Sequence, residues 1–288
     1  MKTTLQLYSL SLAFLSSAVI NCGGPAADDT ENFQSLIRVM PMHHPGDVSP
    51  AEDRASQAAK TLTNYGGPTL KNVKVIPVYW NASVAYASNL TSFYQSIFTS
   101  SIYTSLLPQY GGIGAGSVPK VFTGANSSAN VTEAQVVSYL NAQIASGALP
   151  TPDANTYYPV HFPPGMTVTD SGGTASCVTW CAFHGTAARS GGSNLNYGII
   201  PDQGGGCAGG CGANAQRVNN LTSVSSHELV EATTDPAVGL ATTYAPPLAW
   251  YNRTYGEIGD ICNAQQATVG GYVVQKEWSN KSNSCNTL

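Results

Sequence analysis

Hydrophobic positions follow two different periods that alternate along the chain from about residue 65. Residues 72–80, NVKVIPVYW, combine branched and aromatic side chains in a short run, which predicts a β-strand. Residues 89–107 place apolar side chains at helical spacing, and this pattern predicts a helix carrying Leu90, Phe93, Ile97, Ile102 and Leu106 on one face. A strand followed by a helix is the first unit of an α/β pattern.

The alternation continues to the end of the chain. Strands are predicted at 118–122, 157–162, 195–200 and 272–278, and helices at 132–144 and 219–233. Thr132 followed by Gln135 has the capping-box pattern, which supports a helix start there. Alternating elements favour a single layered α/β domain over residues 61–288, in which the Gly/Cys-rich segment 172–212 is predicted to be a loop held by disulfides.

The first 60 residues lack such a period and are expected to lie outside this domain. Residues 1–21 have an early lysine, an apolar run and small residues before a cleavage point, which is the layout of a secretory signal peptide. A lipoprotein attachment at Cys22 is the alternative, although Asn21 is a poor residue before a modified cysteine. Residues 22–60 then form a flexible or processed leader, and the mature protein is expected to be secreted and extracellular.

Composition excludes several classes of function. Only 10% of residues are charged and the formal net charge is -4, so there is no basic surface for nucleic acid or an anionic membrane. No second apolar stretch reaches the length of a membrane span. Asn-x-Ser/Thr sequons predict a glycoprotein in a eukaryotic host, and they occur at Asn81, Asn89, Asn126, Asn130, Asn220, Asn252 and Asn280.

Beyond Cys22, the cysteines form two C-x3-C clusters and one later pair. A four-thiolate zinc site is the alternative to disulfides, but secretion and the absence of a C-x2-C knuckle disfavour it. We predict that the cluster Cys177/Cys181 is joined to the cluster Cys207/Cys211, and that Cys262 pairs with Cys285.

The segment SSHELVEATTDP, residues 225–236, carries the most specific chemistry. If it is helical, His227 and Glu231 lie on one face, where an imidazole and a carboxylate can ligate one metal ion, and Glu228 beside them is a candidate general base. The pattern is similar to half of a zinc-protease helix, with glutamate in place of the second histidine. A zincin-like arrangement with zinc as the cofactor is therefore the finer expectation for the fold.

A hydrolytic zinc site needs about three protein ligands and a position where bound water is acidified. Asp260 is the first candidate for the third ligand, Asp235 the second, and Glu257 a further one. Glycines in the GEIGD segment allow its backbone to turn towards an ion.

Each of these residues also has a structural interpretation. Ser225 to Glu228 is itself an S-x-x-E capping box, so Glu228 would only cap a helix that begins there. Asp235 before Pro236 fits a plain turn after a helix. His184, in FHG between the cysteine clusters, is a candidate structural hydrogen-bond donor, with a ligand role as the alternative.

The order of several motifs resembles a known family. TNYGGPTLKNVKVIPVYW, SCVTWCAFHG, YGIIPD, CAGGC, HELVEATTDP and GEIGDIC follow one another between residues 64 and 285, as in the phosphate-induced, EXORDIUM-like family of secreted proteins and its microbial relatives. The resemblance implies an extracellular or cell-wall location and, for plant members, roles in growth signalling without an established catalysis. This chain departs from the plant pattern by keeping His227-Glu228 intact.

Two functions follow from these observations. The first is a secreted zinc-dependent, peptidase-like hydrolase. The second is a non-catalytic extracellular or wall-associated signalling or binding protein whose partner is an extracellular peptide or a cell-wall component. Other hydrolase and nucleotide-binding classes are disfavoured, because the chain has no G-x-S-x-G elbow and no G-x-G-x-x-G between a strand and a helix.

Overall fold

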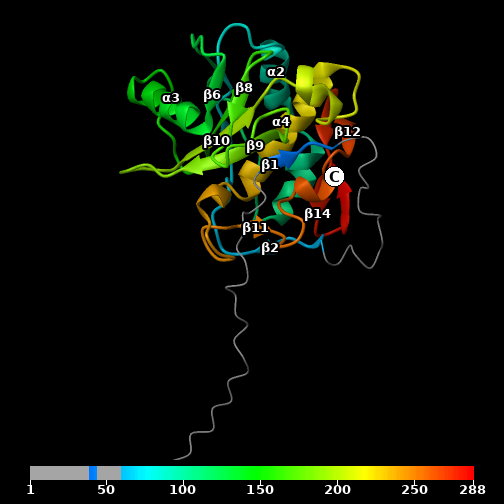
Figure 1. Ribbon diagram of the computed structural model, residues 1–288. Helices are drawn as coiled ribbons and strands as arrows, with labels where there is room; N and C mark the ends of the chain where they lie inside the picture. Colours follow the sequence, from blue (N-terminus) through cyan, green and yellow to red (C-terminus); the bar gives the residue numbers. More distant parts are fainter. Residues whose placement is uncertain (1–38, 44–59) are drawn as a thin grey trace, which may run out of the picture. The chain divides into compact units, whose positions relative to one another are not determined.

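A seven-stranded mixed sheet organises the computed structural model, which describes residues 39–43 and 60–288 (Figure 1). Its strands run in the order β1-β9-β10-β7-β4-β5, and β3 also pairs with β7. The strands are β1 (Val39–Pro41), β3 (Lys74–Val75), β4 (Val78–Tyr79), β5 (Phe122–Thr123), β7 (Thr156–His161), β9 (Trp180–Ala187) and β10 (Leu195–Ile200). The segment from β10 to β5 is parallel, whereas β9 and β1 are antiparallel to their neighbours.

Helices cover both faces of this sheet, which confirms a layered α/β fold. They are α2 (Ala87–Ile97), α3 (Glu133–Ala145) and α4 (Arg217–Thr234). Adjacent residues of a strand point to opposite faces. On β7, Tyr158 joins the apolar cluster that includes side chains of α3, while Tyr157 joins the cluster that includes most of the buried face of α2. The predicted capping box of α3 is present, with Thr132 and Gln135 satisfying each other's backbone N–H groups.

The remaining elements are short. Four two-stranded sheets pair β2 (Thr63–Asn64) with β11 (Trp250–Tyr251), β6 (Asn130–Thr132) with β8 (Thr167–Thr169), β12 (Gln266–Val269) with β13 (Tyr272–Gln275), and β14 (Glu277–Ser279) with β15 (Ser284–Asn286). Short helical turns are the π-helical η2 (Ile102–Leu106) and the 3-10 helices η3 (Leu107–Gln109), η4 (Gly205–Gly209), η5 (Val238–Leu240) and η6 (Asp260–Cys262).

Helix α4 is buried along most of its length although much of its sequence is polar. Every residue from Asn220 to Thr234 is buried. Its hydroxyl groups are satisfied within the helix, since Ser225 Oγ donates to the carbonyl of Leu221 at 2.6 Å and Thr233 Oγ1 donates to that of Leu229 at 2.6 Å. A helix of this kind can bring charged side chains into the interior.

Several predicted elements are divided in the structure. The strand predicted at 72–80 is split into β3 and β4, because Pro77 between them has no N–H for the ladder. The helix predicted at 89–107 ends at Ile97 and resumes as η2 and η3. The segment 272–278 forms two strands in different hairpins, and of 118–122 only Phe122 lies in a strand.

Two predictions about disorder and loops were wrong. The segment 172–212 contains β9, a strand of the main sheet that lies between β1 and β10, besides the predicted β10. Its uninterrupted run of uncharged side chains is typical of a strand buried on both faces. The expected leader contributes β1 to the same sheet, where Met40 is 3% exposed and belongs to the core.

The disulfide prediction is confirmed in full. Cys177 bonds Cys207, Cys181 bonds Cys211, and Cys262 bonds Cys285. These bonds are typical of proteins that fold in an oxidising compartment and are consistent with an extracellular protein. Within residues 39–43 and 60–288, none of the helices has the length and apolar character that a membrane crossing requires. The expected signal peptide and Cys22 lie outside the described residues, as does the whole of the first of two compact units, residues 1–32.

Candidate metal centre

The central turns of α4 carry three buried polar side chains, His227, Glu228 and Glu231, each at most 1% exposed. Because the helix begins at Arg217, ten residues or so before them, the capping-box interpretation of Glu228 is excluded. The helix ends at Thr234, and Asp235 is its C-terminal cap residue. The three side chains are therefore held by a long, regular helix rather than by a frayed end.

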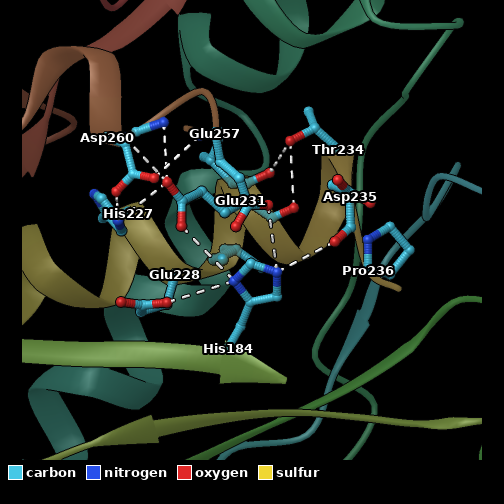
Figure 2. Close-up of polar contacts among 12 residues, drawn as sticks. His184, His227, Glu228, Glu231, Thr234, Asp235, Pro236, Glu257 and Asp260 are labelled. Carbon is cyan, nitrogen blue, oxygen red and sulfur yellow. Dashed lines mark hydrogen bonds and ion pairs between the residues drawn. The ribbon is translucent and has the colours of Figure 1, made fainter. Parts of the chain in front are cut away.

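His184 of β9 faces these carboxylates from the sheet (Figure 2). Its Nδ1 lies 3.7 Å from Oε2 of Glu228 and 3.7 Å from Oε2 of Glu231. Its Nε2 lies 3.2 Å from the backbone carbonyl of Asp235 and 3.5 Å from Oε1 of Glu257. A carbonyl oxygen only accepts hydrogen bonds, so Nε2 carries a proton and donates to Asp235.

The GEIGD segment supplies a third side of the cluster. The backbone N–H groups of Gly259 and Asp260 donate to Oε1 of Glu231 at 3.2 and 3.1 Å. Oδ2 of Asp260 accepts from the N–H of Glu257 at 3.0 Å, and Oδ1 of Asp260 lies 3.9 Å from His227 Nε2. A Cβ atom at position 259 would come within 2.6 Å of His227 Nδ1, so only glycine allows this close approach.

Gln275 of β13 contacts His227 from the remaining side. Its Nε2 donates to the carbonyl of Gly259 at 2.8 Å and lies 2.7 Å from His227 Nδ1. The other ring nitrogen, His227 Nε2, lies 3.1 Å from Oε1 of Glu231. The histidine is thus held between an amide and a carboxylate.

Several polar atoms of this cluster lack a hydrogen-bond partner among the described residues. They are His184 Nδ1, His227 Nε2, both carboxylate oxygens of Glu228 and Glu257, Oδ2 of Asp235 and Oδ1 of Asp260. Buried polar groups are almost always paired, and a buried carboxylate without a counter-charge is costly. The described ion pairs of the cluster involve only the two histidines as cations, so carboxylates outnumber them.

Burial changes the acidity of these groups. It raises the pKa of Glu257 and Asp260 well above the ordinary values, because the low-dielectric surroundings and the neighbouring carboxylates disfavour a further negative charge. Burial raises the pKa of Asp235 to about 7. Burial alone would lower the pKa of His184, but the carboxylates of Glu228 and Glu231 outweigh it and raise the value. The metal-free cluster therefore favours bound positive charge.

The donor atoms lie close enough together to hold a metal ion. Two groups of three have ligand atoms that lie within 4.8 Å of one another, namely His184 with Glu231 and Glu257, and His227 with Glu228 and Glu231. Ligands about 2.1 Å from a tetrahedral zinc ion are about 3.4 Å from one another. The two 3.7 Å contacts of His184 Nδ1, with Oε2 of Glu228 and Oε2 of Glu231, are close to that separation and too long for hydrogen bonds. Imidazole and carboxylate ligands suit zinc.

The structure thus brings together four of the residues predicted from sequence: His227, Glu228, Glu231 and Asp260. Asp235 contributes its backbone carbonyl to His184, while Oδ1 of its carboxylate accepts from the N–H of Ala249 at 2.9 Å. Glu257, the further candidate, lies beside His184. The sequence interpretation gave His184 a structural role, with a ligand role only as the alternative, and overlooked Gln275. The buried-strand pattern around His184 was the signal that could have placed it against the helix.

Comparisons with protein families, with curated proteins and with solved structures found no match for this chain.

Proposed function

We propose that this chain is a secreted metal-binding protein whose buried centre supports metal-dependent hydrolysis, with zinc as the metal. The observation that carries the proposal is His184 Nδ1, a buried imidazole nitrogen without a hydrogen-bond partner among the described residues, which faces Oε2 of Glu228 and Oε2 of Glu231 at 3.7 Å each. A divalent cation satisfies such a group of atoms, whereas leaving it unpaired is costly.

The chemistry of the centre agrees with a hydrolytic role. Zinc supplies Lewis acidity when it is bound by imidazole and carboxylate ligands. Glu228 has two carboxylate oxygens without a hydrogen bond from the described residues, and burial raises its pKa. A carboxylate with a raised pKa is suited to accept a proton near neutral pH, which is the role expected of a general base.

Family membership, secretion and a zincin-like arrangement are proposed from the sequence and from the position of the His-Glu-x-x-Glu motif on α4. The order of motifs supports membership of the EXORDIUM-like family and secretion, and the location of His227, Glu228 and Glu231 within one helix supports a zincin-like arrangement. A cavity of about 270 Å³ is lined in part by Leu70 and by Pro236 and Ala237, the two residues that follow Asp235 in the sequence. It is the proposed approach for a peptide or cell-wall substrate.

Burial favours a second candidate function. Glu228 and Glu257 are 0% exposed and His184 is 1% exposed, whereas a hydrolytic ion must be reached by its substrate. A non-catalytic extracellular binding protein, stabilised by an internal metal ion, has no such requirement. Access to substrate therefore separates the two candidates, and both require a bound metal.

The metal is tested by melting the purified mature protein at pH 7 with added zinc and with a chelator. An ion present at about 100 times its dissociation constant raises the melting temperature by roughly 5–10 °C in a domain of this size. We expect this shift in wild type and its loss in His184→Asn. His161→Asn is the matched control, because His161 is equally buried on the neighbouring part of the sheet but outside both ligand groups. An equal response to chelator in all three proteins, or none in wild type, would reject the metal.

Catalysis is tested with Glu228→Gln, which preserves shape and removes the proton acceptor. For a general base, the variant should keep its zinc and lose about 10²- to 10⁴-fold in the rate of peptide hydrolysis. Zinc content by elemental analysis is measured on the same sample. Loss of zinc from the variant would show that Glu228 is a ligand, and a zinc-loaded wild type without hydrolytic activity would leave the binding protein as the function.

A further inference from the structure

The helix motif marks His227 as the first metal ligand, yet hydrogen bonds give its ring a different role. Nε2 of Gln275 donates to the carbonyl of Gly259, an atom that can only accept, and this bond fixes which end of the amide faces the imidazole. The amide nitrogen therefore lies against His227 Nδ1, at 2.7 Å. Nδ1 must accept this hydrogen bond, so the proton of the neutral ring is on Nε2.

The protonated Nε2 of His227 lies beside a carboxylate oxygen of Glu231 that already accepts two hydrogen bonds. His227 Nε2 lies 3.1 Å from Oε1 of Glu231, and the same oxygen accepts from the N–H groups of Gly259 and Asp260. The two backbone N–H groups thus occupy the lone pairs of Oε1, and the protonated Nε2 of His227 lies beside the same oxygen. Neither Nε2 of His227 nor Oε1 of Glu231 retains a lone pair that is directed at an ion.

In His184, by contrast, the nitrogen that faces the carboxylates of Glu228 and Glu231 is the one without a proton. Its Nε2 donates to the carbonyl of Asp235, so the lone pair is on Nδ1, which faces Oε2 of Glu231 at 3.7 Å and has no hydrogen-bond partner among the described residues. Metal-binding histidines commonly donate their second ring nitrogen to a backbone carbonyl in this way, because the bond fixes the tautomer that ligates. His184 is 1% exposed and is aimed into the cluster.

We infer that His184 and Oε2 of Glu231 bind the ion, and that His227 is a positioning residue that acts on the ion only through Glu231. The inference rests on the proposed metal centre and reverses the role that the helix motif assigns to His227. Glu257 lies beside Nε2, the protonated nitrogen of His184, at 3.5 Å. His227, Gln275 and the Gly259 amide form a second layer that fixes the rotamer of Glu231 and leaves Oε2 free.

The experiment compares zinc affinity in metal-depleted wild type, His184→Asn, His227→Gln and His227→Leu, with His161→Asn as control. His184→Asn should weaken zinc binding by more than 1000-fold. His227→Leu should weaken it by about 10- to 100-fold, the usual effect of removing a supporting hydrogen bond. His227→Gln retains an N–H donor towards Glu231 and should remain within about 10-fold of wild type, a rescue that a ligand role would not permit.

X-ray absorption at the zinc edge gives a second readout, the number of imidazoles bound to the ion. We expect one imidazole bound to zinc in wild type and the same single imidazole in His227→Leu. Two bound imidazoles in wild type, or complete loss of zinc from both His227 variants with normal folding by circular dichroism, would overturn the inference and leave the metal centre standing. A wild type that binds no zinc would overturn the metal centre itself.

Discussion

At the scale of single residues, three buried histidines acquire different properties from their neighbours. His161 on β7 contacts the hydroxyl of Tyr94 at 3.1 Å through Nε2, and its Nδ1 has no hydrogen-bond partner among the described residues. Burial lowers the pKa of His161 to about 3. His184 is equally buried, but its carboxylate neighbours raise its pKa. Burial alone therefore does not determine the charge of a histidine; the partner does.

The low pKa of His161 makes stability depend on pH. The unfolded chain protonates this residue below pH 6.5, whereas the folded protein resists protonation down to about pH 3. The unfolded state binds more protons between these values, so the free energy of unfolding falls as the pH falls, by at most about 1.4 kcal/mol per pH unit. Above pH 6.5 this contribution is constant. Denaturant unfolding with chelator present should show a shallower decline for His161→Asn than for wild type between pH 6 and pH 4.

Parallel curves for the two proteins across that range would contradict this account. The comparison isolates His161, because the buried carboxylates around His184 titrate in both proteins and their effect cancels in the difference.

At the scale of elements, the turn before η6 determines how closely the cluster packs. Gly256 has a φ of 84°, which favours glycine, and a Cβ there would lie 2.2 Å from Oδ2 of Asp260. At Gly259 a Cβ would meet His227 Nδ1 at 2.6 Å and Oε1 of Glu231 at 2.8 Å. The two glycines therefore allow the backbone to lie directly against the helix side chains, and the amide donors of this turn depend on that approach.

Replacing Gly259 with alanine should destabilise the protein by about 1–3 kcal/mol, the range for forcing extra atoms into a packed interior. It should also weaken zinc binding, because the amides that hold Glu231 move away. Gly209→Ala is the control, since a Cβ there meets nothing within 4 Å, and it should change stability by less than about 0.5 kcal/mol. Urea unfolding of both variants measures the difference. Equal stability of the two would show that the turn accommodates a methyl group without loss.

Sequence patterns located the helices and strands more accurately than they predicted the contacts between them. The period of apolar residues located α3, α4, β7 and β10. The spacing of the cysteines predicted which clusters are joined and the Cys262–Cys285 bond, but not the individual partners within the two clusters. The division of 72–80 and 272–278 was missed because strand boundaries there depend on which neighbour each part pairs with. His184 and Gln275 join the helix residues across 44 to 48 positions of sequence, and such contacts arise from the sheet rather than from local spacing. The helix motif identified the right region, while the role of each side chain required its hydrogen-bond partners.

At the scale of the whole molecule, the glycosylation sequons differ in burial, and four of them lie at the two extremes. Asn220 and Asn252 are 4% and 7% exposed, and Nδ2 of Asn220 donates to the carbonyl of Asn214. Asn89 and Asn130 are exposed. Protein secreted from a eukaryotic host should carry glycans at the two exposed positions and none at the two buried ones, because a buried glycan is incompatible with the folded structure. Peptide mapping by mass spectrometry measures this. A glycan on Asn220 in folded, secreted protein would contradict the packing around α4.

Two disulfides join the two C-x3-C clusters and connect the strand that carries His184 to the segment before α4. Cys181 precedes His184 on β9, and Cys211 precedes α4, which carries Glu228 and Glu231. Oxidation therefore tethers the two halves of the donor set even in an unfolded chain and removes much of the loop entropy that separates them. If the proposed centre holds an ion, thiol oxidation should come first and metal loading second, so a chain kept reduced would be a poor metal scavenger. The oxidised chain would then take its ion from the surroundings in which its disulfides form.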